Sequence, residues 1–213
     1  MFTTEVIMAG FGGQGMLLSG KLLAHAAMER GLEVSWLPSY GPEMRGGTAN
    51  VTVCLSDHPV GSPYIRHPQV LLVMNRPSLE RFAPVVRPGG LIVVNSSLVP
   101  DKCGREDCTI VYVAASEVAR QAGAARAANM AMLGVYVGWS GIVDAEATIH
   151  AIQEEFRNKR KLILPNVAAF KAGLEEGAKS RKAGQEIGSE AGHAVGRGSG
   201  RGAARNAGQG VGA

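Results

Sequence analysis

The stretch Val6-Ile-Met-Ala-Gly10-Phe-Gly-Gly-Gln-Gly15 decides the fold of this chain. Its four apolar residues, 6–9, predict a short buried strand, and the glycines that follow have G-x-G-x-x-G spacing. Because a helical pattern begins directly afterwards, the glycines occupy a turn from a strand into a helix. Backbone N–H groups and the partial positive charge of a helix N-terminus favour phosphate or another anion there. The alternative is that the glycines only allow tight packing of strand and helix.

The segment after this turn predicts a helix and a second strand. Leu18, Leu22 and Ala26 recur at i, i+4 on one face of a helix that Gly31 ends, and residues 34–37 form a strand closed by Pro38. The first forty residues therefore predict a βαβ unit and a parallel sheet. An Asp or Glu that would hold the ribose of NAD is missing at the end of the second strand, which disfavours ordinary NAD binding.

A second glycine-rich stretch, Ser39-Tyr-Gly-Pro-Glu-Met-Arg-Gly-Gly-Thr48, has the composition of a loop. It leaves the same edge of the sheet as the first glycine turn, and ligands of open α/β sheets bind along that edge. Between glycines, Arg45 could present its planar fork to a phosphate or a carboxylate. The alternative is a turn in which Arg45 pairs with Glu43 or caps a helix.

The remaining pattern predicts an α/β fold with an open, mainly parallel, Rossmann-like sheet flanked by helices. Further strands are expected at residues 49–55, 69–75, 91–94 and 109–113. Asn75 either places a polar group on the ligand edge or begins a helix with Pro77 in its first turn. Residues 116 to about 177 are predicted to be helical. One helix is expected to begin near Asn129, one to span residues 144–157, and one to run from an N-cap at Asn166 through Glu176.

Residues 1–178 are expected to form one domain, and residues 179–213 a Gly/Ala-rich, basic and disordered tail. The tail has little apolar content, and glycine recurs at every fourth position from Gly184 to Gly200. Residues from Arg157 onward carry eleven Lys or Arg against four Asp or Glu, whereas residues 1–156 carry eleven against fourteen. The body is therefore mildly acidic, which argues against a nucleic-acid-binding core.

Composition excludes several other classes of protein. The apolar runs are too short to span a bilayer, and the early first strand leaves no room for a signal peptide, so the expected location is the cytoplasm. Three cysteines, Cys54, Cys103 and Cys108, do not make a disulfide framework or a cluster motif. The five histidines are scattered. A metal ion or iron–sulfur cluster held by this chain alone is not expected.

The two glycine-rich stretches together with Asn75-Arg-Pro77 and Asn129-Met-Ala-Met-Leu-Gly134 resemble the γ subunit of 2-oxoacid:ferredoxin oxidoreductases. That family includes pyruvate, 2-oxoisovalerate, 2-oxoglutarate and indolepyruvate enzymes. The resemblance runs from about Glu5 to Glu176, and residues 179–213 are unlike the usual family ending.

The resemblance implies a multi-subunit enzyme that converts a 2-oxoacid and coenzyme A to an acyl-CoA and CO₂ and reduces ferredoxin. It implies that thiamine diphosphate, Mg²⁺ and the iron–sulfur clusters belong to partner chains, and that this chain is inactive alone. The implied partners are α, β and δ (ferredoxin-like) subunits and ferredoxin, without nucleic acid or membrane. No catalytic residue or metal ligand is expected in this chain. The residues expected to contact coenzyme A or a cofactor are Gly10, Gly12, Gly13, Gln14, Gly15, Tyr40, Arg45, Gly46, Gly47 and Asn75.

The substrate preference follows from the Ser39-Tyr-Gly-Pro42 form of the second stretch, which favours 2-oxoglutarate or branched-chain 2-oxoacids over indolepyruvate. Two other classes of function remain open. One is a nucleotide-binding oxidoreductase that acts alone, and the other is a non-catalytic interaction module whose basic tail binds an acidic partner or nucleic acid.

Overall fold

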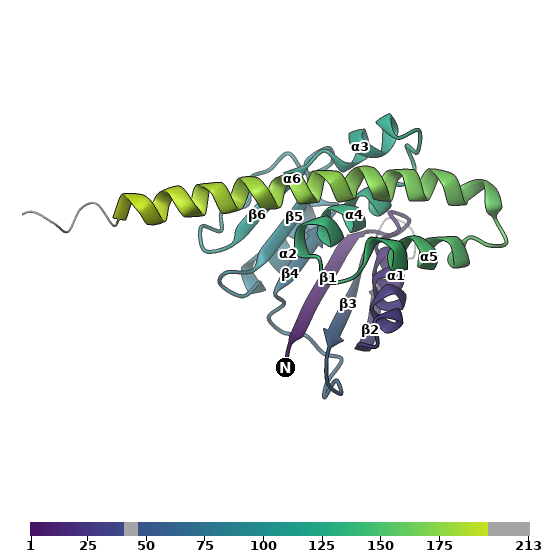
Figure 1. Cartoon of the computed structure of the whole chain (residues 1–213), viewed down its shortest axis with the longest axis horizontal. Helices are drawn as coiled ribbons and strands as arrows, with labels where there is room; N and C mark the ends of the chain where they lie inside the picture. The colour runs from purple at the N-terminus through teal and green to yellow at the C-terminus, as the bar shows by residue number, and fades with distance from the viewer. Residues whose placement is uncertain (41–46, 196–213) are drawn as a thin grey trace, which may run out of the picture.

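A computed structural model describes residues 1–40 and 47–195 of the chain, and only the backbone for Tyr40 and for residues 183–195. Residues 41–46 and 196–213 lie outside the described part, and so do the predictions made for them. Figure 1 shows the described chain as one sheet with helices against it and a long last helix across them.

A six-stranded mixed sheet forms the centre of the fold, in the order β2-β3-β1-β4-β5-β6. The strands are β1 (Thr3–Phe11), β2 (Glu33–Tyr40), β3 (Thr48–Ser56), β4 (Val70–Val73), β5 (Leu91–Asn95) and β6 (Thr109–Val113). β1, β4, β5 and β6 pair in parallel, whereas β3 runs antiparallel to both of its neighbours. The predicted α/β class and every predicted strand are confirmed, with changes only at the strand ends.

β1, α1 and β2 form the predicted βαβ unit, since β1 and β2 run in the same direction, but the antiparallel β3 lies between these two strands, so the sheet is mixed rather than wholly parallel. Consecutive strands joined by a short connection form an antiparallel hairpin, and β2 and β3 do so. β2 also continues past Pro38 to Tyr40. Because β2 is an edge strand, a proline there removes no hydrogen bond from the ladder when its nitrogen faces outward. The end of β2 and the start of β3 lie at the same sheet edge as the end of β1, where Phe11 pairs with Thr48.

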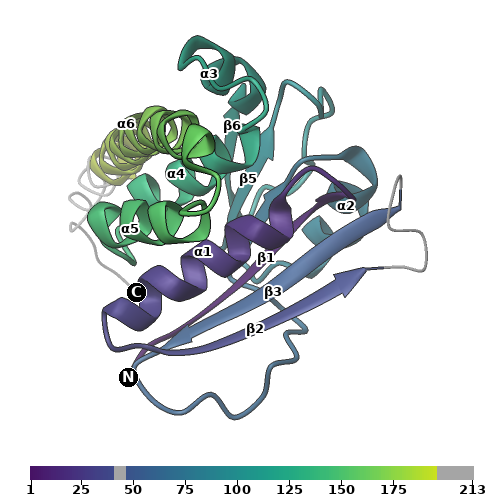
Figure 2. The same ribbon diagram turned by 90° about the vertical axis from the view of Figure 1, so that its right-hand side faces the viewer.

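The helices cover the two faces of the sheet unequally (Figure 2). They are α1 (Met16–Glu29), α2 (Arg76–Phe82), α3 (Ala115–Gln121), α4 (Ala128–Ser140), α5 (Ala145–Glu155) and α6 (Ile163–Val195), with short 3-10 helices η1 (Ala83–Val85) and η2 (Arg160–Leu162). The larger core lies under α1, α4, α5 and α6, and the smaller one under α2 and η1.

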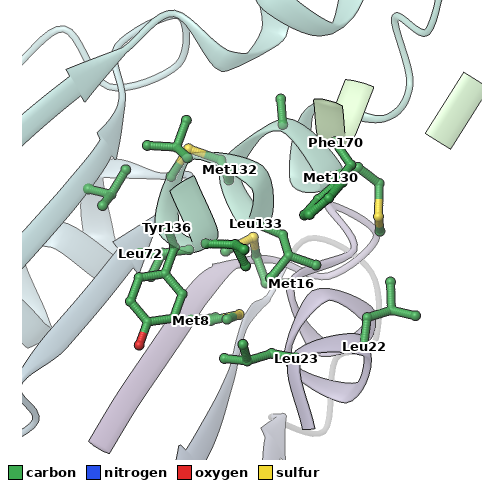
Figure 3. Close-up of a cluster of buried hydrophobic side chains, with 14 of the residues drawn as sticks. Met8, Met16, Leu22, Leu23, Leu72, Met130, Met132, Leu133, Tyr136 and Phe170 are labelled. Atoms are coloured by element: carbon green, nitrogen blue, oxygen red, sulfur yellow. The ribbon is translucent and has the colours of Figure 1, made fainter. Parts of the chain in front are cut away.

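Alternation along β1 divides its side chains between these two cores. Val6 and Met8 belong to the larger core, and Ile7 and Ala9 belong to the smaller one. Figure 3 shows Met8 and Leu72 of the sheet facing Met16 of α1 and the side chains of Leu133 and Tyr136 of α4. All of these side chains are at most 2% exposed, so the sheet and α1 hold α4 in a fixed position.

α4 and α6 pack without side chains between them at four glycines. A Cβ atom on Gly134 would lie 2.1 Å from the carbonyl oxygen of Phe170, and one on Gly138 would lie 2.1 Å from that of Leu174. In the same way, Cβ atoms on Gly173 and Gly177 of α6 would lie 2.1 Å from the carbonyl oxygens of Ala131 and Val135 of α4. Because later residues of α4 meet later residues of α6, the two helices run parallel, with their N-terminal ends at the same end of the pair.

The predicted start and end of the last helix are both wrong. Asn166 lies inside the first turn of α6 rather than at its cap, and its Nδ2 donates to the carbonyl of Leu162 (2.7 Å). The helix passes Glu176 and continues to Val195. Gly177 packs on the backbone of α4, and Lys179 pairs with Glu176 (2.8 Å). These contacts stabilise the helical turn after Glu176, which the glycine content of the sequence did not predict. Within the described ranges, no helix is both long and apolar enough to cross a bilayer.

Candidate functional site

The glycine turn after β1 is held by backbone geometry that needs glycine at two positions. Gly13 has a φ of 95° and Gly15 a φ of 79°, in the left-handed region that side chains disfavour. Gly15 is also close to α4, because a Cβ atom there would lie 2.6 Å from Nδ2 of Asn129. The turn therefore needs glycine both for its backbone angles and for its packing.

Gln14 fixes the turn to the end of β4. Its Oε1 accepts the N–H of Phe11 (2.6 Å), and its Nε2 donates to the carbonyl of Met74 (3.2 Å). A Cβ atom on Gly10 would lie 2.6 Å from the same Oε1, so glycine at that position makes room for this side chain. Gln14 thus acts as an internal brace of the turn.

The two glycine-rich stretches meet directly. The N–H of Gly12 donates to the carbonyl of Gly47 at 2.9 Å. This contact joins the turn after β1 to the end of the β2–β3 hairpin at one edge of the sheet, as the sequence predicted. It also means that the N–H of Gly12 is occupied, so a direct contact of this group with a phosphate, as predicted, does not fit this structure.

Asn129 joins the glycine turn to the first turn of α4. Its Nδ2 donates to the carbonyl of Gly15 (3.1 Å) and lies 3.2 Å from the Ser19 hydroxyl, and that hydroxyl donates to the carbonyl of Asn129 (3.1 Å). Asn129 and Ser19 are both buried. The N-terminal ends of α1 and α4 are therefore locked side by side.

A hollow of about 510 Å³ opens beside this junction. First turns of three helices line it: Gly15 and Leu18 from α1, Ala127 and Asn129 from α4, and Pro165 and Asn166 from α6. The full lining is Gly13, Gln14, Gly15, Leu18, Gly123, Ala124, Ala125, Arg126, Ala127, Asn129, Phe156, Leu162, Pro165 and Asn166. Its walls are mainly apolar, and its polar groups are backbone, amide and guanidinium groups.

The electrostatics of the hollow favour a negative ligand. Neither α1 nor α4 has a side-chain cap or an acidic residue in its first turn, so their terminal N–H groups keep their partial positive charge. Arg126 is exposed on the rim, and no ion pair joins it to a described residue. No Asp or Glu belongs to the lining. The arrangement is suited to binding an anion, and it contains no acid–base pair for proton transfer.

The predicted site residues divide into three groups. Gly13, Gln14 and Gly15 line the hollow, while Gly10, Gly12 and Gly47 shape the loops behind it. Asn75 is buried and is the N-cap of α2, where its Oδ1 accepts the N–H of Ser78 (2.8 Å). The helix alternative for Asn75 is therefore correct. Arg45, Gly46 and the side chain of Tyr40 lie outside the described residues.

The sequence did not point to Arg126 or to the residues that α5 and α6 contribute. These residues lie more than 100 positions after the glycine turn, and no motif or spacing connects them to it. They meet it only because α4 and α6 run parallel over α1. The Asn129 motif was the one signal in the sequence that pointed to this part of the chain.

A second hollow, of about 440 Å³, lies on the other face of the sheet between α2 and residues 101–105. Both of its arginines are paired, Arg76 with Glu80 (2.8 Å) and Arg105 with Asp107 (2.6 Å). Cys103 lines it, and burial raises the pKa of the neighbouring Cys108 thiol, which keeps that thiol protonated. Among described residues, no three His, Cys, Asp or Glu side chains gather as a metal site.

Comparison with known proteins places these features in a family. A family model described as pyruvate ferredoxin/flavodoxin oxidoreductase matches residues 5–176. The ketoisovalerate oxidoreductase subunit VorA of Methanothermobacter marburgensis is 42% identical over 178 residues, which are 83% of this chain and 37% of VorA. The chain thus spans little more than a third of that relative.

Two further proteins match over nearly their whole length. The 2-oxoglutarate synthase subunit KorC of Methanothermobacter thermautotrophicus is 32% identical over 80% of this chain and 93% of its own. The crystal structure of a keto/oxoacid ferredoxin oxidoreductase γ subunit from Geobacter sulfurreducens has a TM-score of 0.71 and 28% identity, and covers 83% of this chain and 99% of that one.

Proposed function

The chain belongs to the pyruvate ferredoxin/flavodoxin oxidoreductase family, and from this premise we propose that it works as the γ subunit of a 2-oxoacid:ferredoxin oxidoreductase. The family match confirms the resemblance that the glycine motifs gave. The proposed enzyme decarboxylates a 2-oxoacid with coenzyme A to an acyl-CoA and CO₂ and reduces ferredoxin. Partner α, β and δ chains would hold thiamine diphosphate, Mg²⁺ and iron–sulfur clusters, and this chain would be inactive without them.

The role proposed for this chain is to bind the phosphate end of coenzyme A. The observation that carries it is the hollow at the glycine turn, where two uncapped helix N-termini and Arg126 face one space without a carboxylate. Coenzyme A has all of its phosphates at its nucleotide end and its reactive thiol at the other end. A subunit that binds only the nucleotide end leaves the thiol free to reach a reaction centre in another chain.

Two 2-oxoacid classes are supported by the relatives. The higher identity is to a ketoisovalerate oxidoreductase subunit and the lower one to a 2-oxoglutarate synthase subunit. We therefore expect a branched-chain 2-oxoacid as the preferred substrate and 2-oxoglutarate as the second choice. A panel of 2-oxoacids offered to the purified complex with coenzyme A and a dye acceptor tests this order directly.

A negative charge placed in the hollow tests the coenzyme A role. Ala125 is exposed and lines the hollow, so Ala125→Glu should fold normally and repel the phosphates. We expect the KM for coenzyme A to rise about tenfold or more with kcat nearly unchanged, as one like charge at about 4 Å costs about 1 kcal/mol in bulk water and more near a protein surface. Met28→Glu is the control, because Met28 is exposed at the far end of α1. An unchanged KM in the Ala125→Glu complex would contradict the proposal.

A nucleotide-binding oxidoreductase that acts alone is the second candidate. The same hollow could receive the phosphate of NAD(P) or a flavin, and it is the one observation in favour of this function. Titration of the isolated chain with each nucleotide distinguishes the two. Tight binding together with turnover in the absence of other chains would replace the subunit proposal.

A further inference from the structure

The connection from α5 to α6 presents exposed cations beside exposed leucines. Residues 157–161, Arg-Asn-Lys-Arg-Lys, are all exposed, and Leu162 and Leu164 follow them with exposed fractions of 43% and 80%. Figure 1 shows this connection at the right-hand end of the molecule. One exposed leucine is ordinary on a protein surface, but two beside a run of cations form a surface with an apolar part and a charged part.

Three of these cations are not balanced by a carboxylate of the described chain. No ion pair joins Lys159, Arg160 or Lys161 to a described residue, and the first turn of α6 has no acidic side chain. Arg157 is closer to a carboxylate, at 3.7 Å from Glu154. The surface therefore carries a net positive charge that favours contact with an acidic surface.

The backbone of this surface is held by its own hydrogen bonds. The N–H of Lys159 donates to the carbonyl of Phe156 (2.7 Å), and the N–H of Leu162 donates to the carbonyl of Lys159 (2.8 Å). The carbonyl of Leu162 in turn accepts Nδ2 of Asn166 (2.7 Å). A partner that binds here orders little additional backbone, which lowers the entropy cost of association.

The surface lies at the rim of the glycine-turn hollow. Leu162 is exposed and lines both that hollow and the one formed by residues 157–162. Pro165 and Asn166, which follow Leu164, line the glycine-turn hollow as well. Leu164 lines neither hollow, so its side chain faces solvent. A protein that covers Leu164 therefore also reaches the rim of the hollow.

We propose that residues 159–164 are the docking surface for the partner chain that holds the thiamine diphosphate centre. This inference rests on the proposed function, in which a substrate held in the hollow reaches a reaction centre in another chain, so that chain has to meet the rim. The partner offers an apolar pocket bordered by carboxylates. Leu164 enters the pocket, and the three cations face the carboxylates, which is the usual arrangement of an apolar interface centre with a polar rim.

A protein fits this surface better than a nucleic acid does. A phosphate backbone has no apolar group for Leu164, and residues 1–156 carry eleven Lys or Arg against fourteen Asp or Glu, which repels a polyanion. An anionic membrane offers both charge and apolar groups, and it is an outcome that the test separates.

The first test is zero-length cross-linking of the complete enzyme complex with a carbodiimide, which joins an amine only to a carboxylate in direct contact. Lys159 or Lys161 should be joined to an Asp or Glu of the thiamine-holding chain. Both amines should also react more slowly with an acylating reagent in the complex than in the isolated chain. Equal reactivity of both lysines in the two states would overturn the inference.

The variant Leu164→Asp tests the apolar contact. The Kd of the chain for its purified partner chains should rise about a hundredfold, because a carboxylate replaces leucine in a pocket that is apolar and bordered by carboxylates. An acidic residue in the first turn favours α6, so the variant should fold. Tyr64→Asp is the matched control, because Tyr64 is 78% exposed between β3 and β4, and its Kd should be that of wild type. An unchanged Kd for Leu164→Asp would contradict the docking surface.

Charge reversal tests the rim. Lys159→Glu/Arg160→Glu/Lys161→Glu should raise the Kd about tenfold or more at low salt, and the difference from wild type should shrink as salt is added. The control Arg66→Glu/Lys102→Glu/Lys182→Glu reverses three exposed cations that line neither hollow. An equal effect of both triple variants would show that only net charge matters and would refute the assignment.

Failure of this inference differs from failure of the proposed function. If wild type assembles with the thiamine-holding chain and the complex is active, while Leu164→Asp assembles equally well, the docking surface is wrong and the function stands. If wild type binds no such chain, the proposed function fails, and the inference fails with it. Binding of the isolated chain to phosphatidylglycerol vesicles that Leu164→Asp abolishes would assign the surface to a membrane instead.

Discussion

Gly15 combines three demands at a single residue. Its φ of 79° is left-handed, a Cβ atom would lie 2.6 Å from Nδ2 of Asn129, and its carbonyl accepts a hydrogen bond from that same amide. Gly15→Ala should lower the free energy of unfolding by about 2–5 kcal/mol, as left-handed strain of about 1–2 kcal/mol adds to an overpacking cost of about 1–3 kcal/mol. Chemical denaturation of the isolated chain measures this value.

Gly104→Ala is the matched control for this substitution. No atom lies within 4 Å of the position its Cβ would take, and its φ is not left-handed. Its stability should stay within about 0.5 kcal/mol of wild type, as expected for a surface change without a named mechanism. An equally stable Gly15→Ala protein would show that the turn relaxes around a side chain.

The sequence predicted the position of the glycine turn but not how each of its residues is used. The G-x-G-x-x-G spacing, together with the flanking strand and helix patterns, identified Gly10, Gly12 and Gly15. Which N–H groups stay free depends on distant partners, as the contact of Gly12 with Gly47 shows. Arg126 could not be predicted, since its place on the rim is set by α4 and not by neighbours in sequence.

Among the elements, the α4–α6 pair has the least tolerance for added volume. Gly134→Ala places a Cβ atom against the backbone of Phe170, which cannot rotate away as a side chain would. The gain in helix propensity of about 1 kcal/mol is outweighed by a displacement that costs about 3 kcal/mol or more. We expect a clear drop in the thermal midpoint and loss of α6 protection in hydrogen exchange. A rise in the midpoint would mean that the helices separate easily.

One contact between α1 and α5 depends on pH. The carboxylate of Glu29 accepts a hydrogen bond from His150 (2.7 Å) and raises the pKa of that imidazole above its ordinary value. Because the folded-state pKa is raised, the contact stabilises the fold fully below the unfolded pKa. That stabilisation is lost as the pH rises through the folded pKa.

NMR titration of His150 tests this contact. The histidine should titrate above its ordinary range in the wild-type chain, and Glu29→Gln should bring its pKa down towards that range. Both groups are exposed, so the effect on overall stability should be small. A His150 pKa that does not respond to Glu29→Gln would remove the contact as the cause.

Elements were predicted more reliably than their pairing. Apolar runs and period-two alternation identified all six strands, because burial on one or two faces leaves a local pattern. The insertion of β3 between β1 and β2 leaves no such pattern, since it depends on which edges meet. The continuation of α6 past Glu176 was missed for a similar reason: Gly177 would weaken an isolated helix, but here it packs on the backbone of α4.

At the scale of the whole molecule, the close contact of α6 with the body occurs in the segment 170–177, well before its described end. Truncation after Lys182 should therefore leave the thermal midpoint of the chain and the activity of the reconstituted complex close to wild type. Truncation after Phe170 should abolish folding, because it removes Gly173 and Gly177 from the α4 contact. Circular dichroism and an activity assay measure both. A large loss of activity on truncation after Lys182 would show that residues 183–213 contribute to function.

The parallel direction of α4 and α6 has an electrostatic consequence of its own. Neighbouring helices in most bundles alternate in direction, which sets opposite dipole ends beside each other. Here two helices that touch backbone to backbone point the same way, so their like ends repel and the protein carries that repulsion as a cost of its fold. An anion at the N-terminal ends would relieve this repulsion. The thermal midpoint of the isolated chain should then rise with the affinity of an added anion for the hollow, so a melting curve reports whether the hollow is occupied.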